Sequence, residues 1–191
     1  MVISVGGEVM YLSPVTEGIT TIVETAQQLA ELVGLPMLFL IFISKGLLIG
    51  KIFPTSVFLP GYVILINASV ESAIVIAVVT ALGYALGQCV VFYGTRRYGE
   101  TFITRLPYSA IDPESPQFER FDEWFHRWGG ISLFTSNFVP WIRGLVTIPA
   151  ATSSYTFPRY LFYTTSSTVI YHLLYVGLAL AGLEILTGIS P

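Results

Sequence analysis

The chain has 191 residues, of which 53% are hydrophobic and 11% charged, with a mean hydropathy of +0.72 and a formal net charge of −3. Soluble domains carry about 25% charged residues, so this composition excludes an ordinary soluble domain and indicates a polytopic membrane protein. No basic patch points to nucleic-acid binding, and the single cysteine, Cys89, excludes an intrachain disulfide and a cysteine-based metal cluster.

The N-terminal segment, residues 1–34, is predicted to contain an amphipathic helix. Ser13 and Pro14 are typical of an N-cap followed by proline at the first helical position, and apolar residues then recur at helical spacing. Glutamate and glutamine fill the other face, so this helix is too polar to span a bilayer and should lie at the interface or against the bundle. Gly34 is predicted to end it.

The next segment, residues 35–67, is apolar but interrupted. Its first part, residues 35–50, is too short to cross the roughly 30 Å hydrocarbon core upright, so it is either a tilted span or one arm of a hairpin. The segment is interrupted at Pro54, Pro60 and Gly61, and it carries a positive charge at Lys51. Irregular backbone within a bilayer is tolerated only against protein or a wet cavity, so we expect a re-entrant hairpin whose lysine either lines the cavity or extends to the headgroups.

Residues 72–95 form the clearest transmembrane helix, because they contain no charged side chain. Small residues recur on two of its faces, Ala73, Ala77, Ala81 and Ala85 on one, and Gly83 and Gly87 on the other. Two other helices can therefore approach it closely. Gln88 is a polar member of this helix, either as a hydrogen-bonded structural residue or as a substrate ligand.

The long polar loop, residues 96–130, contains five arginines, whereas the turn at 67–72 and the tail at 184–191 contain no lysine or arginine. The positive-inside rule therefore places the loop in the cytoplasm and the C-terminus outside. From Ser115 and Pro116 onward the loop is predicted to form a helix that ends at the Gly129-Gly130 pair. Its aromatic face at the inner interface would comprise Phe118, Phe121, Phe125 and Trp128, with His126 on the solvated side.

The second interrupted segment, residues 131–156, carries a charge among apolar residues. Arg143 at hydrocarbon depth would cost about 2.5 to 3.5 kcal/mol, and Pro140 and Pro149 break the chain on either side of it. A hairpin that lines a polar cavity satisfies both demands. In that cavity Asn137 could donate hydrogen bonds.

A second clean helix, residues 160–183, follows this segment just as the first clean helix follows the first interrupted segment. An interrupted segment plus an intact helix, occurring twice, indicates an inverted-repeat-like transporter with its site between the halves. His172 lies near the middle of this helix, either as a satisfied structural histidine or as part of a proton relay. Gly177 and Ala181 are available for close packing.

The two interrupted segments and their flanks resemble the DedA family, whose shared region is also called the VTT or SNARE-associated domain, over about residues 35–182. The motifs that carry the resemblance are Leu59-Pro60-Gly61, Phe92 to Gly99, Phe138 to Arg143, and Ala150 to Ser153. The resemblance implies an all-helical protein with two facing re-entrant hairpins that moves lipids. Family members are associated with returning polyprenyl phosphates to the cytoplasmic face or with scrambling phospholipids.

The chain differs from the family at three positions that the family associates with proton coupling. Tyr62 stands where the family has an acid after Pro-Gly, and Asn137 replaces the first arginine of the arginine pair. The glutamate expected before the first break has no equivalent between Gly46 and Pro54. Arg143 remains at a matching position, so the resemblance is to a divergent member.

These observations predict an all-α integral membrane protein with two re-entrant, proline-broken hairpins, each followed by a transmembrane helix, plus amphipathic interfacial helices. Its single membrane domain would span residues 35–183, in the plasma membrane. We expect it to translocate an anionic polyprenyl phosphate, with Arg143, Lys51, Asn137 and Gln88 at the substrate site. The alternatives are an uncoupled phospholipid scramblase and a non-transporting scaffold; self-association is left open.

Enzyme chemistry is not expected, because the serine motifs of intramembrane proteases and the motifs of membrane lipid phosphatases do not occur in this sequence. His126 and His172 have no clustered carboxylate or cysteine partner, so neither a metal nor another cofactor is expected.

Overall fold

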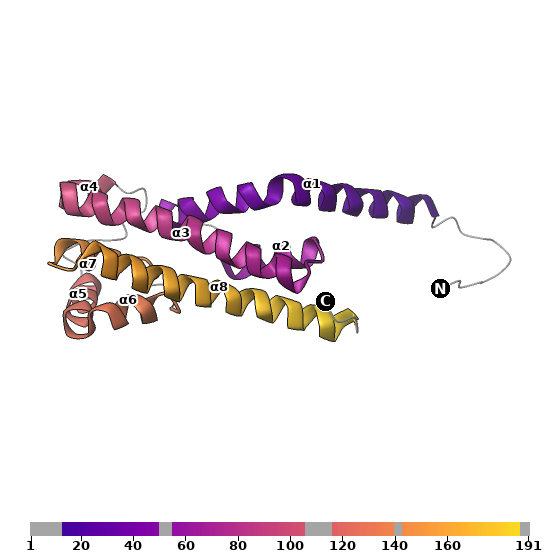
Figure 1. Ribbon diagram of the computed structural model, residues 1–191. Helices are drawn as coiled ribbons and strands as arrows, with labels where there is room; N and C mark the ends of the chain where they lie inside the picture. Colours follow the sequence, from indigo (N-terminus) through magenta and orange to yellow (C-terminus); the bar gives the residue numbers. More distant parts are fainter. Residues whose placement is uncertain (1–12, 50–54, 106–115, 140–142, 188–191) are drawn as a thin grey trace.

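The computed structural model describes residues 13–49, 55–105, 116–139 and 143–187, and every element in these ranges is a helix (Figure 1). The helices are α1 (Ser13–Gly46), α2 (Thr55–Leu65), α3 (Val70–Tyr98), α4 (Glu100–Arg105), α5 (Pro116–Trp128), α6 (Gly130–Ser136), α7 (Thr147–Thr152) and α8 (Phe157–Thr187). The predicted all-α architecture is confirmed for these ranges.

Two of these helices, α3 and α8, are long and apolar enough to cross a membrane, as predicted. The 29 residues of α3 correspond to about 44 Å of helix, more than the roughly 30 Å of hydrocarbon. Ser69 is the N-cap of α3, because its side chain accepts a hydrogen bond from the backbone N–H of Ser72. Gly99 ends α3 in a positive-φ conformation of 57° that favours glycine.

The first helix corrects one prediction, because α1 continues through Gly34 and Pro36 for 34 residues. Gly34 serves close packing here, since a Cβ at that position would overlap the ring of Tyr62. Pro36 removes one backbone hydrogen bond, but Leu38 and Phe42 beyond it are buried in the core shared with α2 and α3. Tertiary packing thus carries the helix past two residues that usually end one.

Glycines bring α1 and α3 into direct backbone contact. A Cβ on Gly83 would lie 2.7 Å from the carbonyl oxygen of Phe39, and one on Gly87 would overlap the carbonyl oxygen of Ile43. Gly46 meets α3 in the same way, against the carbonyl oxygen of Tyr84. The predicted close approach at Gly83 and Gly87 is therefore confirmed.

On α8, the small residues do not pack as predicted. Gly177 is exposed, and a Cβ built on it would meet nothing within 4 Å. Ala181 is exposed as well. The contacts of α8 with α2, α3 and α6 come from its other faces, so the prediction of close packing at this pair is wrong within the single chain.

The predicted hairpin breaks lie only partly where the backbone is irregular. Pro60 and Gly61 lie inside α2, where Leu59 and Val63 are fully buried and compensate for the hydrogen bond that Pro60 removes. Pro149 lies in the first turn of α7, where the backbone N–H that proline lacks has no helical partner. Pro54 and Pro140, like Lys51, lie outside the described residues.

The irregular backbone itself falls just after α1 and between α6 and α7. Leu48 has a φ of 63° beyond the end of α1, and Gly144 has a φ of 84° before α7. Both interrupted segments therefore contain a turn between two described helices, although Pro60 and Gly61, where a break was predicted, lie within α2.

The polar loop also contains a helix where its sequence predicts one. α5 begins at Pro116 and ends at Trp128, where Gly129 takes a φ of 52°. Phe125 is buried against α6, whereas Trp128 and His126 are exposed; the side chains of Phe118 and Phe121 lie outside the description.

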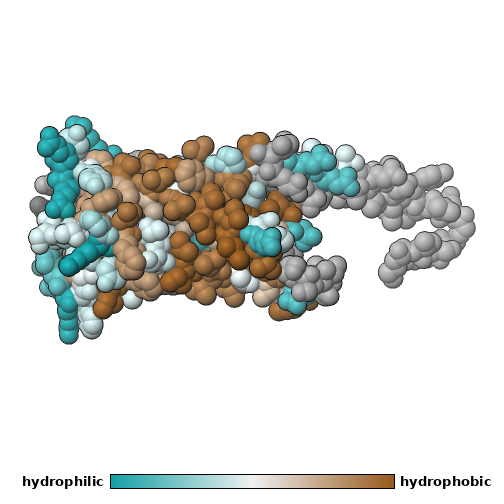
Figure 2. Space-filling model, viewed as in Figure 1, coloured by the Kyte–Doolittle hydropathy of each residue, from teal (hydrophilic) through white to brown (hydrophobic). Residues whose placement is uncertain are grey.

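The surface carries an apolar band between polar ends (Figure 2). The polar end on the left contains α4 and α5 and the start of α8, and the band covers the middle of α3 and α8. Exposed leucine, isoleucine and valine side chains are suited to lipid, so the surface agrees with a membrane protein that has two candidate spans.

Candidate functional site

The centre of the molecule holds Arg143, which is only 9% exposed. It follows the break between α6 and α7, where its backbone N–H donates to the carbonyl oxygen of Val139 at 3.0 Å. Gly144 is required beside it, because a Cβ there would lie 2.7 Å from Gln88 Nε2 and 2.9 Å from Tyr84 Oη. The turn thus delivers a guanidinium into the contact between α3 and α8.

Two tyrosine rings cover the guanidinium of Arg143. Its Cζ atom lies 4.2 Å from the ring centroid of Tyr84 on α3 and 4.2 Å from that of Tyr171 on α8. A cation over an aromatic face is attracted by the ring quadrupole, and the attraction grows when water is excluded. The two rings therefore stabilise the charge and limit the directions from which a ligand can approach it.

His172 on α8 holds one nitrogen of this group. Arg143 Nη2 donates to His172 Nε2 at 3.1 Å, and His172 Nδ1 lies 2.9 Å from Thr80 Oγ1 on α3. Thr80 uses its own hydroxyl proton toward the carbonyl oxygen of Ile76 at 2.7 Å, so it accepts from Nδ1. Because arginine has only donors, Nε2 must be an acceptor, and the imidazole is the neutral Nδ1–H tautomer.

Two other nitrogens of Arg143, Nε and Nη1, are buried without a hydrogen-bond partner. No ion pair joins Arg143 to a carboxylate among the residues that the structure describes. Guanidinium presents two-donor edges that match carboxylate or phosphate oxygens. Whichever hydrogen of Nη2 His172 takes, one such edge remains available, so the arrangement is suited to an anion.

A second cation, Lys45, lies in the last turn of α1 and is close enough to Arg143 for the two charges to interact. Its Nζ atom lies 5.8 Å from the ring centroid of Phe42, which in turn packs edge-on against His172 at 4.8 Å. Lys51, the cation that the sequence favours for this role, lies outside the described residues.

Gln88 joins the ends of both interrupted segments. Its Nε2 donates to the carbonyl oxygen of Gly46 at 2.6 Å, and its Oε1 accepts from the Thr147 hydroxyl and, at 3.3 Å, from Tyr160 Oη. Leu48, just past α1, clusters with Ile148 on α7. Gln88 therefore holds the two segments together against α3, close to Arg143.

Asn137 lies apart from this network. It caps the end of α6 and donates to Ser167 Oγ on α8 at 2.6 Å. No hydrogen bond links Asn137 to Arg143 among the described contacts. The structure therefore brings Arg143, Gln88 and His172 together, and Asn137 is not part of this group.

The two tyrosines and Thr80 are site residues that sequence reasoning missed. An aromatic side chain with a hydroxyl in mid-helix, away from the interfacial belts where tyrosine is usual, is a signal that could have pointed to Tyr84 and Tyr171.

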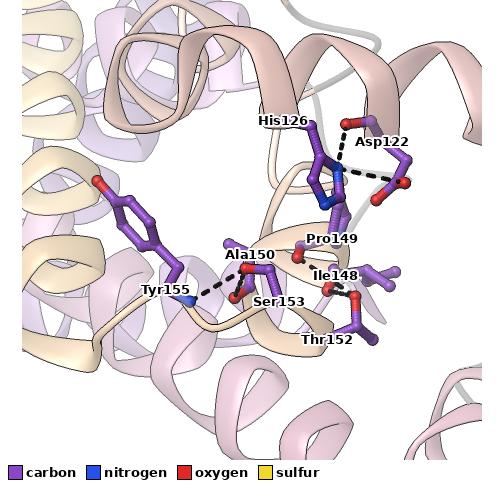
Figure 3. Close-up of polar contacts among 8 residues, drawn as sticks. All are labelled: Asp122, His126, Ile148, Pro149, Ala150, Thr152, Ser153 and Tyr155. Atoms are coloured by element: carbon purple, nitrogen blue, oxygen red, sulfur yellow. Dashed lines mark hydrogen bonds and ion pairs between the residues drawn. The ribbon is translucent and has the colours of Figure 1, made fainter.

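The motif Ala150 to Ser153 ends α7 and turns the chain toward α8 (Figure 3). Ser153 Oγ donates to the carbonyl oxygen of Ala150 at 3.0 Å and accepts from the backbone N–H of Tyr155 at 3.2 Å. Figure 3 also shows His126 turned toward Asp122 on its own helix, at 3.4 Å from the carboxylate. The predicted solvated position of His126 is confirmed, since its side chain is 62% exposed.

Comparisons with known proteins give one family and two relatives. The family model described as the VTT domain matches residues 53–179. Two curated proteins named "Alkaline phosphatase-like protein", from Lactococcus lactis subsp. cremoris (strain MG1363) and subsp. lactis (strain IL1403), are each 26% identical over 108 residues, covering 54% of this chain and 50% of the relative. The chain thus spans about half the length of these relatives. No solved structure matches it significantly.

Proposed function

This chain belongs to the VTT-domain family, also known as the DedA or SNARE-associated family, whose domain is an integral membrane fold, and we propose that it moves an anionic polyprenyl-phosphate lipid across the bilayer. The family is generally transporter-like and non-enzymatic, so the phosphate is cargo in this proposal. The name of the Lactococcus relatives applies to those proteins.

The observation that carries the proposal is the buried Arg143 with two unpaired donor nitrogens. An unpaired charge in a low-dielectric interior is costly, and a phosphate that replaces its missing hydrogen bonds recovers much of that cost. A lipid phosphate has the reciprocal need, since it must lose hydration on its way across the hydrocarbon. Lys45 would add a second positive charge for a phosphate that carries two negative ones.

In this proposal both interrupted segments are re-entrant hairpins that meet within the bilayer. The contacts of Gln88 with Gly46 and Thr147 support it, because they hold the residue before the first break and the residue after the second against the same point of α3. Backbone that leaves helical geometry there is shielded by α3 and α8 rather than exposed to lipid. Lys51 and Asn137 remain proposed ligands at the periphery of the path.

The test is lipid movement in liposomes that contain the purified protein and a labelled polyprenyl phosphate. Arg143→Ala should slow movement at least about tenfold, since a hydrogen bond to a charged group contributes roughly 1.5 to 3 kcal/mol. Arg97→Ala is the matched control, because Arg97 is exposed in the last turn of α3 and should leave the rate unchanged. An Arg143→Ala protein as fast as the wild type would remove Arg143 from the mechanism.

An uncoupled phospholipid scramblase is the second candidate, favoured by the lack of a carboxylate partner for Arg143 among the described residues. The same liposomes with labelled phosphatidylcholine decide between the two. Equal movement of this zwitterionic lipid would indicate a scramblase, and no movement of either lipid by the wild type would indicate a scaffold.

A further inference from the structure

A hollow of about 530 Å³ opens at the polar end of the molecule, away from the central site. It lies where α6 begins and where α8 begins, and its walls are Gly130, Tyr155, Pro158, Arg159, Phe162 and Tyr163. This is the end at which the polar surface meets the apolar band (Figure 2). The hollow therefore lies at the depth where lipid headgroups would reside.

Arg159 supplies a positive charge to this hollow. Its side chain is exposed, and no ion pair joins it to a carboxylate in the described ranges. Arg159 and Tyr155 line the hollow together. Partial burial raises the pKa of the Tyr155 hydroxyl, with Tyr163 acting in the same direction, so this hydroxyl keeps the proton that it could donate.

Glycine at position 130 makes room for the two tyrosines. A Cβ there would overlap the ring of Tyr163 and lie 2.6 Å from Tyr155 Oη. On the other side, Arg96 Nη1 donates to the carbonyl oxygen of Tyr155 at 2.9 Å, which fixes that residue against α3. The phenol groups are therefore held in place by contacts with two helices before any ligand arrives.

One rim of the hollow is apolar. Phe162 is 65% exposed and lies on α8 one turn beyond Arg159, where the apolar band begins. An arginine and phenol groups beside an exposed aromatic ring match a molecule that has an anionic head and an apolar tail. Basic pockets between helices at a membrane surface are suited to anionic lipid headgroups.

We propose that this hollow is a binding site for the headgroup of an anionic phospholipid, with Arg159 on the phosphate, Tyr155 and Tyr163 as hydrogen-bond donors, and Phe162 against the acyl chain. The site is separate from Arg143 and does not depend on the proposed transport. A lipid held there lies beside α6, the first helix of the second interrupted segment, and beside α8, the helix that follows this segment.

Native mass spectrometry of the full chain tests this proposal. The protein is equilibrated in detergent with phosphatidylglycerol or phosphatidylcholine, and the retained lipids are counted. Wild type should retain phosphatidylglycerol preferentially, and Arg159→Gln should weaken that retention about fivefold, as expected for the loss of one basic residue. Tyr163→Phe keeps the ring, removes the hydroxyl and should weaken retention less.

Two controls make the result specific. Arg97→Gln removes an exposed arginine that does not line the hollow and should leave retention unchanged. In an Arg143→Ala background, Arg159→Gln should cause the same further drop in retention, which separates this site from the proposed transport site. Equal retention by Arg159→Gln and wild type, an equal loss with Arg97→Gln, no further drop from Arg159→Gln in the Arg143→Ala background, or equal retention of phosphatidylcholine would overturn the proposal.

Discussion

At the scale of single residues, the guanidinium of Arg143 lies against two tyrosine rings, and its Nε and Nη1 atoms have no hydrogen-bond partner. The tyrosine rings of Tyr84 and Tyr171 stabilise the cation, and His172 orients it through one nitrogen. Lysine could not take this place, because an ammonium has neither a planar face to stack nor a two-donor edge.

We predict that His172→Leu destabilises the protein by about 1 to 3 kcal/mol, because it leaves Arg143 Nη2 and Thr80 Oγ1 without their shared partner. His172→Gln retains an acceptor and should lose less than half as much. Thermal unfolding in detergent micelles measures both. A His172→Leu protein as stable as the wild type would show that the imidazole contributes nothing to holding Arg143.

Arg143 could be predicted from sequence because a charge among apolar residues is costly wherever it lies. His172 was singled out for the same reason, although its partners could not be identified. Their mid-helix position could have singled out Tyr84 and Tyr171, but their contact with Arg143 could not be predicted, since it depends on how α3 and α8 are rotated about their axes. Hydropathy fixes which residues are inside, but not which of them face one another.

At the scale of elements, α3 is the helix on which the others assemble. It contacts α1 through glycines, α8 through Thr80 and Phe92, and α7 through Gln88 and Phe92. Close backbone approach replaces the hydrophobic driving force that lipid does not supply between helices.

We predict that Gly87→Ala destabilises the protein by about 1 to 3 kcal/mol, because the added methyl overlaps the backbone of α1 at Ile43 and Gly46. Gly177→Ala is the matched control in a second apolar helix, where the methyl meets nothing within 4 Å. It should be neutral or stabilising by up to about 1 kcal/mol. Melting temperatures in micelles compare the two, and equal shifts would contradict the close contact of α1 and α3.

The helices α3 and α8 could be predicted from hydropathy alone, whereas the boundaries of α1 and α2 could not. Gly34 and Pro60 are residues that end or bend helices in isolation, and local rules therefore predicted breaks there. Burial of Phe42, Leu59 and neighbouring side chains against other helices outweighs the lost hydrogen bonds. That contribution is tertiary and has no local signal.

At the scale of the whole molecule, the polar end contains α4, α5 and the end of α3, and these helices carry Arg96, Arg97, Arg105, Arg120 and Arg127. Short loops with excess arginine remain in the cytoplasm. The proposed orientation therefore places residues 96–130 inside and the end of α8 outside.

Cysteine labelling tests this orientation, since Cys89 can first be replaced by serine. Glu184→Cys, at an exposed position near the end of α8, should react with a membrane-impermeant maleimide in intact cells. Glu123→Cys, exposed on α5, should react only after permeabilisation. The reverse pattern would invert the proposed topology.

The membrane class and the pair of spans followed from composition and length, because a bilayer imposes the same requirement on every chain that crosses it. The tyrosine-lined hollow near Arg159 did not, since it forms from the starts of α6 and α8, about 30 residues apart in the sequence. A hollow of this kind exists only once the helices have packed together, so no local sequence pattern predicts it.

The unpaired guanidinium of Arg143 also couples anion binding at the central site to the stability of the folded protein. An anion that binds there satisfies donors that are otherwise buried and unpaired, so it must favour the folded over the unfolded protein by an amount that grows with its concentration. Cargo of the right chemistry should thus reveal itself by raising the melting temperature of wild type but not of Arg143→Ala, without any need to observe a crossing. The melting temperatures measured with a panel of soluble phosphate monoesters and diesters would then rank the candidate headgroups.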